Sequence, residues 1–221
     1  MSLSYIQTIL PALLEGTGQT LKIFSLTLVF SLPLGLLISF ATMSRFFPLK
    51  ALGKLYVWVF RGTPLMLQIF FFFYCLPLFT PLKLDRLTTA VFTFVLNYAA
   101  YFAEIYRGGI QSIDRGQREA AKSLGFSSWQ TMRMIIIPQA VRRVIPPVSN
   151  EVITLIKDTA LVYVIGVPEL LKAAKDANNR DVDPTAYFIA ALIYLALTFA
   201  LTMLSQYMEK RFSRHERKDT V

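Results

Sequence analysis

Charged residues are scarce in this chain of 221 residues: Asp, Glu, Lys and Arg make up 17% of it, against 54% hydrophobic residues and 18 Phe. A water-soluble domain of this length rarely carries so little charge with so much apolar side chain. The charges also cluster, which leaves long uncharged stretches between them. This composition excludes an ordinary soluble globule and predicts a protein whose solvent is largely the lipid bilayer.

Cysteine and histidine are nearly absent, with one of each, Cys75 and His215. One cysteine cannot form an intramolecular disulfide, and one histidine cannot build a histidine-based metal cluster or triad. The chain also lacks G-x-S-x-G, H-E-x-x-H and the phosphate-binding G-x-x-x-x-G-K-[ST] motif. We therefore expect no catalytic residue, no metal site and no cofactor in this chain. If ATP drives the protein, another chain must bind it.

Five apolar stretches are long enough to cross a bilayer as helices, at about 20 residues each. The fourth contains Glu151, Lys157 and Asp158, and Pro33 and Pro77 are expected to kink the first and second. We predict an all-α membrane protein, a single domain over residues 1–221, with transmembrane spans at residues 22–43, 64–82, 88–106, 148–167 and 185–207.

The positions of the basic residues predict the orientation, because Lys and Arg favour the cytoplasmic side of short loops. They gather after the first span, after the third span and in the tail, at Arg45, Lys50, Lys54, Arg61, Arg107, Arg115, Arg118, Lys122, Arg133, Arg142, Arg143, Lys210, Arg211, Arg214, Arg217 and Lys218. We predict a cytoplasmic C-terminus, which with five spans places the N-terminus outside. We attribute the net charge of +9 to these basic residues, whose positions report the orientation of the protein in the membrane. A nucleic-acid site is disfavoured because no contiguous soluble basic face supports it.

The start of the chain does not resemble a cleavable signal peptide, because nothing basic precedes the first apolar stretch and Glu15 is its first charge. Residues 4–16 are expected to form a short helix on the outer surface.

A charged, amphipathic stretch, GQREAAKSLGFSSWQTMRMIIIPQA, occupies residues 116–140 at the centre of this apolar chain. It reads as two short helices. Gly125 lies where a helix ends in a left-handed residue, and Ser127 with Gln130 predicts a capping box that opens the second helix. Pro138 is expected to interrupt that second helix. Such a hairpin suits docking to a protein partner. The alternative is an amphipathic loop that lies among lipid headgroups.

The same stretch resembles the pattern E-A-A, three residues, G, nine residues, I, one residue, L-P, which marks the membrane subunits of bacterial ABC importers. The chain departs from the pattern once, with Ile137 in place of Leu, and matches it at Glu119, Ala120, Ala121, Gly125, Ile135 and Pro138. FRGTPLMLQIFFFFY, NYAAYFAEIYRGGIQSIDRGQ and IPQAVRRVIPPVSNEVITLIKDTALVYVIGVPELL look like the polar amino-acid branch of these permeases, and the resemblance extends over residues 10–212.

This resemblance implies a type I ABC importer permease of the bacterial inner membrane, with five spans and a cytoplasmic coupling helix within residues 110–138. It implies contacts to the ATPase at Glu119, Ala120, Ala121, Gly125, Phe126 and Trp129. It also implies three partners. The first is a second permease, which is either a copy or a paralogue. The others are a dimer of ATPase subunits that bind ATP and Mg²⁺, and an extracellular binding protein that delivers an amino acid. The permease would not be an enzyme by itself. It would move its substrate by alternating access. The alternative function is a passive membrane channel or scaffold without ATP coupling.

Polar residues inside spans are costly and usually face a cavity or a partner. In the third span, Asn97, Tyr101 and Glu104 lie on one helical face. The predicted substrate-binding residues are Gln68, Asn97, Tyr101, Glu104, Lys157 and Asp158.

An α-amino acid needs an acceptor for its ammonium group and donors for its carboxylate. Glu104 or Asp158 is the candidate acceptor, and Asn97, Lys157 or Arg61 the candidate donor. The acidic balance of the inner charges favours a cationic or zwitterionic substrate. The alternative is that Lys157 and Asp158 pair with other spans and only hold the bundle together.

Overall fold

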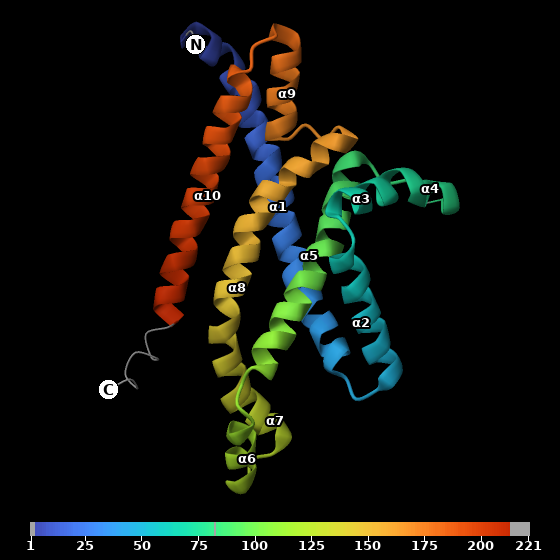
Figure 1. Cartoon of the computed structure of the whole chain (residues 1–221), viewed down its shortest axis with the longest axis vertical. Helices are drawn as coiled ribbons and strands as arrows, with labels where there is room; N and C mark the ends of the chain where they lie inside the picture. The colour runs from blue at the N-terminus through green and yellow to red at the C-terminus, as the bar shows by residue number, and fades with distance from the viewer. Residues whose placement is uncertain (1–2, 82, 213–221) are drawn as a thin grey trace.

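A computed structural model of the protein describes residues 3–81 and 83–212, and every regular element within these ranges is a helix (Figure 1). In chain order they are α1 (Leu3–Met43), α2 (Phe47–Gly62), α3 (Leu65–Phe70), a π-helical turn (Phe71–Cys75), α4 (Leu76–Phe79), α5 (Arg86–Gln111), α6 (Arg115–Ser123), α7 (Ser128–Gln130), a π-helical turn (Thr131–Ile136), α8 (Ile137–Asp158), a 3₁₀-helical segment (Thr159–Ile165), α9 (Leu170–Asp181) and α10 (Thr185–Phe212). The N-terminus and α9 lie at one end of the molecule, and α6 and α7 at the other (Figure 1).

Helices α1 and α5 form the centre of the bundle, with α2 packed on both of them, α8 on α5, and α10 on α8. The core buries Phe94, Tyr98 and Phe102, which lie four residues apart on one face of α5. Gly35 of α1 lets the two central backbones approach closely. A Cβ atom at Gly35 would lie 2.8 Å from the Cβ of Phe102 and 3.0 Å from the carbonyl oxygen of Ala99. Small residues at such crossings are typical of helices packed in membranes.

Gly35→Ala is expected to lower the stability of the folded permease by about 1–3 kcal/mol, because rigid atoms of α5 must move to admit one methyl group. The measurement is the thermal unfolding midpoint of the detergent-purified protein. Gly18→Ala is the matched control on the same helix, since a Cβ atom there meets nothing within 4 Å. Equal midpoints for the two variants would contradict the close packing of α1 on α5.

The region between the first two predicted spans differs from expectation, because helix α2 replaces the predicted basic loop. Lys50, Lys54 and Arg61 fall on one face of α2 and apolar side chains cover the opposite face. The charges therefore mark one side of an amphipathic helix. After α2 the chain bends by 106°, α3 packs against α5, and α4 at the end of the segment Leu65–Phe79 points away from the bundle (Figure 1).

Two described helices, α1 and α10, are each long and apolar enough to cross a bilayer, and α2 with Leu65–Phe79 makes a third if this bent pair is one crossing. Asn97 and Glu104 in α5, and Lys157 and Asp158 in α8, lower the hydropathy of those two helices. The predicted spans lie on α1, on the bent segment after α2, on α5, on the end of α8 with its 3₁₀ continuation, and on α10. Five crossings therefore stay a prediction.

The separate surface helix expected at residues 4–16 is wrong, because these residues are the first turns of the continuous helix α1, which contains both Pro11 and Pro33. Ile9 and Leu13 pack against Leu170 of α9 and Ala186 of α10. The apolar face of this segment is thus covered by protein. Leu82, His215 and the tail charges Arg214, Arg217 and Lys218 lie outside the described residues.

Candidate functional site

Two adjoining cavities with polar linings open between α2, α5 and α8, and they share Arg61, Gly62 and Tyr101. Their volumes are about 570 and 460 Å³. We call them together the polar cleft. Three basic and three acidic side chains line it, namely Lys54, Arg61, Arg107, Glu104, Glu151 and Asp158. The cleft is therefore balanced in charge, whereas the sequence predicted an acidic balance because Lys54 and Arg107 were not among the inner charges.

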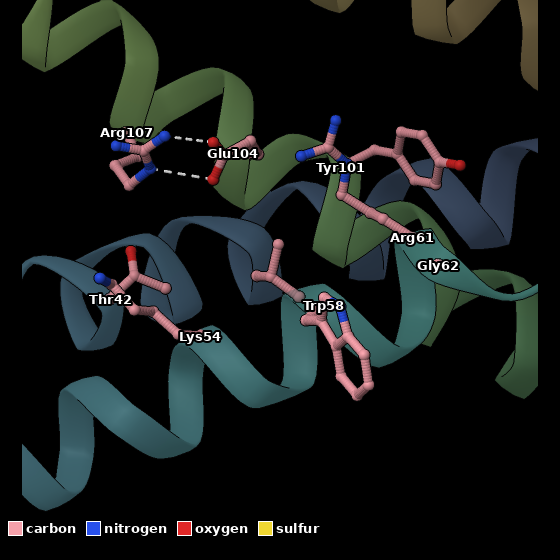
Figure 2. Close-up of a pocket in the computed structure, with 9 residues that line it drawn as sticks. Thr42, Lys54, Trp58, Arg61, Gly62, Tyr101, Glu104 and Arg107 are labelled. Atoms are coloured by element: carbon pink, nitrogen blue, oxygen red, sulfur yellow. Dashed lines mark hydrogen bonds and ion pairs between the residues drawn. The ribbon is translucent and has the colours of Figure 1, made fainter.

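Arg61 lies at the junction of the two cavities, at the end of α2 (Figure 2). The guanidinium carbon of Arg61 stands 5.2 Å from the centre of the Tyr101 ring. Its charge acts on both Glu104 and Glu151, but it forms no salt bridge with any described residue. A guanidinium that stacks on an aromatic face keeps its N–H edge available for a carboxylate.

Glu104 and Arg107 form a two-pronged ion pair in the first cavity (Figure 2). The Nε atom of Arg107 donates to Oε2 of Glu104 at 2.9 Å, and its Nη2 atom donates to Oε1. Arg107 also donates to Oε1 of Gln111 at 2.5 Å. The carboxylate of Glu104 is therefore already paired in this conformation, and a substrate ammonium group would have to share it with Arg107.

The second cavity gathers hydrogen-bond acceptors on one face of α8, where Glu151, Thr154 and Asp158 are three and four residues apart. The hydroxyl of the buried Tyr98 donates to Oδ2 of Asp158 at 2.8 Å. Two carboxylates opposite Arg61 form an arrangement that can hold an ammonium group and a carboxylate of one small molecule.

Asn97 and Gln68 bind mainly the backbone at the bend after α2. The Nδ2 atom of Asn97 donates to the carbonyl oxygen of Phe60 at 3.1 Å and to Oε1 of Gln68 at 3.0 Å. The Nε2 atom of Gln68 donates to the carbonyl oxygens of Phe60 at 2.9 Å and Thr63 at 3.1 Å. These bonds fasten the bend that presents Arg61 to the cleft.

The structure brings four of the six predicted substrate residues to the polar cleft, namely Asn97, Tyr101, Glu104 and Asp158. Gln68 lines neither cavity, and Lys157 is exposed outside both.

The predicted substrate residues did not include several polar or aromatic side chains that line the polar cleft, namely Thr42, Lys54, Trp58, Thr63, Tyr98, Arg107, Glu151 and Thr154. A signal for two of them was present, because Lys54, Trp58 and Arg61 have the spacing of one helical face. The basic residues of this region predict a cytoplasmic loop, and in a loop such spacing does not place side chains on one face.

The central hairpin consists of α6, the turn at Gly125, α7 and the π-helical turn that follows it. Gly125 has φ +81°, which confirms the predicted left-handed residue. The predicted capping box is also confirmed: Oγ of Ser127 accepts from the backbone N–H of Gln130 at 3.2 Å, and the side chain of Gln130 accepts from the N–H of Ser127 at 2.8 Å.

The expected interruption at Pro138 is wrong, because the helical backbone continues from Ser128 through to Asp158. The π-helical turn at Thr131–Ile136 directly precedes Pro138. Proline has no backbone N–H to donate, and the shifted hydrogen bonds of a π-helical turn let the helix continue past it.

The hairpin presents an exposed surface at the end of the molecule remote from the N-terminus (Figure 1). Leu124 is 77% exposed and Trp129 is 68% exposed. Glu119 and Ala120 are exposed as well, whereas Ala121 is buried and Phe126 is half-buried. Large apolar side chains this exposed on a charged hairpin are typical of a surface that a partner covers.

Comparisons with known proteins agree with this architecture. Residues 31–214 match the family model described as binding-protein-dependent transport system inner membrane component. The chain is 39% identical to the glutamine transport system permease protein GlnP of Escherichia coli (strain K12), over 94% of this chain and 96% of that protein. It is 37% identical to the arginine transport system permease protein ArtQ of Bacillus subtilis (strain 168), over 98% of this chain and 100% of that protein.

The fold also matches solved structures. A crystal structure of an amino acid ABC transporter with histidines contains a chain that superposes with a TM-score of 0.89 at 34% identity, covering 96% of this chain and 100% of that chain. A chain of the inward-facing MetNI methionine ABC transporter superposes with a TM-score of 0.70 at 17% identity, which shows a shared fold. The protein therefore belongs to the family of inner membrane components of binding-protein-dependent transport systems, as one of the multi-pass amino-acid ABC transporter permeases of bacterial inner membranes, whose ATPase is a separate chain.

Proposed function

We propose that this permease carries a polar, zwitterionic amino acid through the polar cleft by alternating access. The observation that carries the proposal is the arrangement around Arg61, which faces Tyr101 and lies between Glu104 in one cavity and Glu151 and Asp158 in the other. In our proposal Arg61 binds the substrate carboxylate, while Asp158 and Glu151 accept its ammonium group. A charged group that substrate binding removes from water and leaves without a partner is costly, so such a site favours molecules that carry both groups.

We further propose five crossings, made by α1, by α2 with the bent segment after it, by α5, by α8 with its 3₁₀ continuation, and by α10. The basic residues of the hairpin and of the end of α10 support a cytoplasmic location for that end of the bundle. The N-terminus and α9 would then lie outside, where an extracellular binding protein delivers the substrate. A second permease, a copy or a paralogue, would complete the transporter on a dimer of ATPase subunits.

The hairpin is proposed as the coupling element that contacts the ATPase through Glu119, Ala120, Gly125 and Trp129. Its exposed apolar side chains and its position at the basic end support this role. Closure of the ATPase dimer would push the hairpin, and the continuous helix from Ser128 to Asp158 would carry that movement to the polar cleft. A passive channel or scaffold would need no such hairpin, which makes it the weaker alternative.

Glu104→Gln tests the substrate role of the cleft. We expect a several-fold loss of ATP-driven uptake with normal assembly, because the variant removes both the ion pair with Arg107 and a negative charge that acts on Arg61, the proposed partner of the substrate carboxylate. The measurement is uptake of labelled glutamine, arginine and cystine by proteoliposomes that contain the permease, its ATPase and the binding protein; these are the amino acids in the names of the related permeases GlnP, ArtQ and TcyB. Glu15→Gln, at an exposed position of α1 outside the polar cleft, is the control. Uptake by Glu104→Gln equal to that of the control would assign Glu104 to packing alone.

A further inference from the structure

A second groove, separate from the polar cleft, opens between α1, α5, α8 and α10. We call it the apolar groove. Its volume is about 630 Å³, and the side chains of Phe40, Ile110, Val141 and Met208 are representative of its lining. None of its lining residues is charged. A zwitterionic substrate would find no ionic partner here, so the occupant must be largely hydrocarbon.

The length of the apolar groove fits one leaflet of a bilayer. On α8 its lining extends from Ile137 to Ser149, which at the helical rise corresponds to about 18 Å. One leaflet contributes about half of a hydrocarbon core that is about 30 Å thick. The groove begins at the hairpin end, where the π-helical turn bonds the N–H of Ile137 to the carbonyl oxygen of Met132 and sets both side chains along the groove.

Basic residues surround the hairpin end of the apolar groove. Arg45 follows the lining residue Met43 by two positions, Arg133 follows Met132 directly, and Arg211 lies one turn beyond Met208. All three arginines are exposed, and none forms a salt bridge with a described residue. The groove therefore has an apolar body and a cationic mouth.

Tyr106 adds a polar contact inside the groove. It is half-buried, and its hydroxyl makes no hydrogen bond within the described part of the chain. Tyrosine is enriched at the depth where lipid ester groups lie.

We propose that the apolar groove is a binding site for an anionic phospholipid, with one acyl chain along α8 and the phosphate at the hairpin end, where Arg45, Arg133 and Arg211 supply positive charge. Clusters of basic residues at the cytoplasmic side of membrane helices attract anionic headgroups. The assignment to the cytoplasmic leaflet rests on the orientation proposed above, and the link to the ATPase rests on the coupling role proposed for the hairpin. Because Met132 and Ile137 belong to the helix that leaves the hairpin, the lipid would support the element that meets the ATPase.

Native mass spectrometry of the permease–ATPase complex, purified from bacterial membranes in mild detergent, tests the proposal. We expect wild type to retain phosphatidylglycerol or cardiolipin. Val141→Trp fills the groove at a lining position that is 44% exposed. The double variant Arg45→Gln/Arg211→Gln removes two positive charges from the hairpin end of the groove. Each is expected to lower the retained anionic lipid about tenfold. The control is Leu195→Trp, at an α10 position that is 64% exposed and lies outside the groove.

Three results would each overturn the proposal: a wild-type complex without anionic lipid, a loss of lipid in Leu195→Trp as large as in Val141→Trp, or full retention in the double arginine variant. The second result would mean that the lipid only surrounds the protein, and the third that the headgroup is not recognised. Lipid retention is measured without transport, so its result is independent of the proposed substrate role of the cleft.

Discussion

Gly125→Val is expected to reduce ATP-driven uptake to below about one tenth of the wild-type rate while the permease still folds and inserts. Gly125 has φ +81° and a Cβ atom there would meet nothing within 4 Å, so the effect comes from backbone strain and not from a clash. A β-branched residue in this conformation costs about 1–2 kcal/mol. The turn relieves the strain by changing its conformation, which displaces Leu124 and Trp129 from the surface offered to the ATPase.

Two further variants sharpen this test. Gly125→Asn is expected to keep most of the activity, because asparagine tolerates the left-handed region. Glu119→Lys reverses an exposed charge on α6 without straining the backbone, so its loss of uptake is expected to be smaller. The measurements are co-purification of the ATPase with the permease and uptake by proteoliposomes. Normal values of both for Gly125→Val would show that the hairpin is not a coupling element.

Arg61→Gln is expected to weaken binding of the amino acid to the polar cleft on the order of a hundredfold, since it removes one partner of a desolvated charge pair. The side chain is exposed at the end of α2, so the variant should fold normally. The measurement is direct binding of labelled glutamine, arginine and cystine to the purified permease–ATPase complex without the binding protein, which isolates the affinity of the cleft.

Arg61→Lys and Lys50→Gln are the controls for this result. Lys50 lies on the same face of α2 but lines neither cavity, so its variant should bind normally. Arg61→Lys keeps the charge and loses the planar pair of donors, so we expect intermediate binding. Unchanged binding in Arg61→Gln would remove Arg61 from the substrate site and leave it as a residue stacked on Tyr101.

The local features of the hairpin were predictable because short-range chemistry determines them. The left-handed Gly125 and the capping box of Ser127 and Gln130 each depend on residues within one turn of the chain. The helical spacing of Asn97, Tyr101 and Glu104 likewise predicted one face of α5, and all three residues line the polar cleft.

The features that depend on tertiary packing were not predictable in this way. Lys54 and Arg61 suggested a loop, because the sequence alone does not show that α5 and α8 enclose a polar cavity for a basic helical face. Residues 4–16 suggested a surface helix because the covering side chains come from α9 and α10, far away in the sequence. Asn97 and Gln68 bond to the backbone at the bend, whereas Arg61 extends into the cleft. Residue spacing does not specify these hydrogen bonds, so the sequence could not separate the two roles.

Uptake by proteoliposomes that contain the permease and its ATPase, with the binding protein added outside, tests the central claim most directly. Labelled glutamine, arginine and cystine are supplied outside, with ATP and Mg²⁺ either enclosed or omitted. The account predicts accumulation of at least one of these amino acids against its gradient when ATP is enclosed, and no flux when ATP is omitted. Equal flux of the same amino acid with and without ATP, stopping at equal concentrations on both sides, would contradict it and identify the chain as a passive channel.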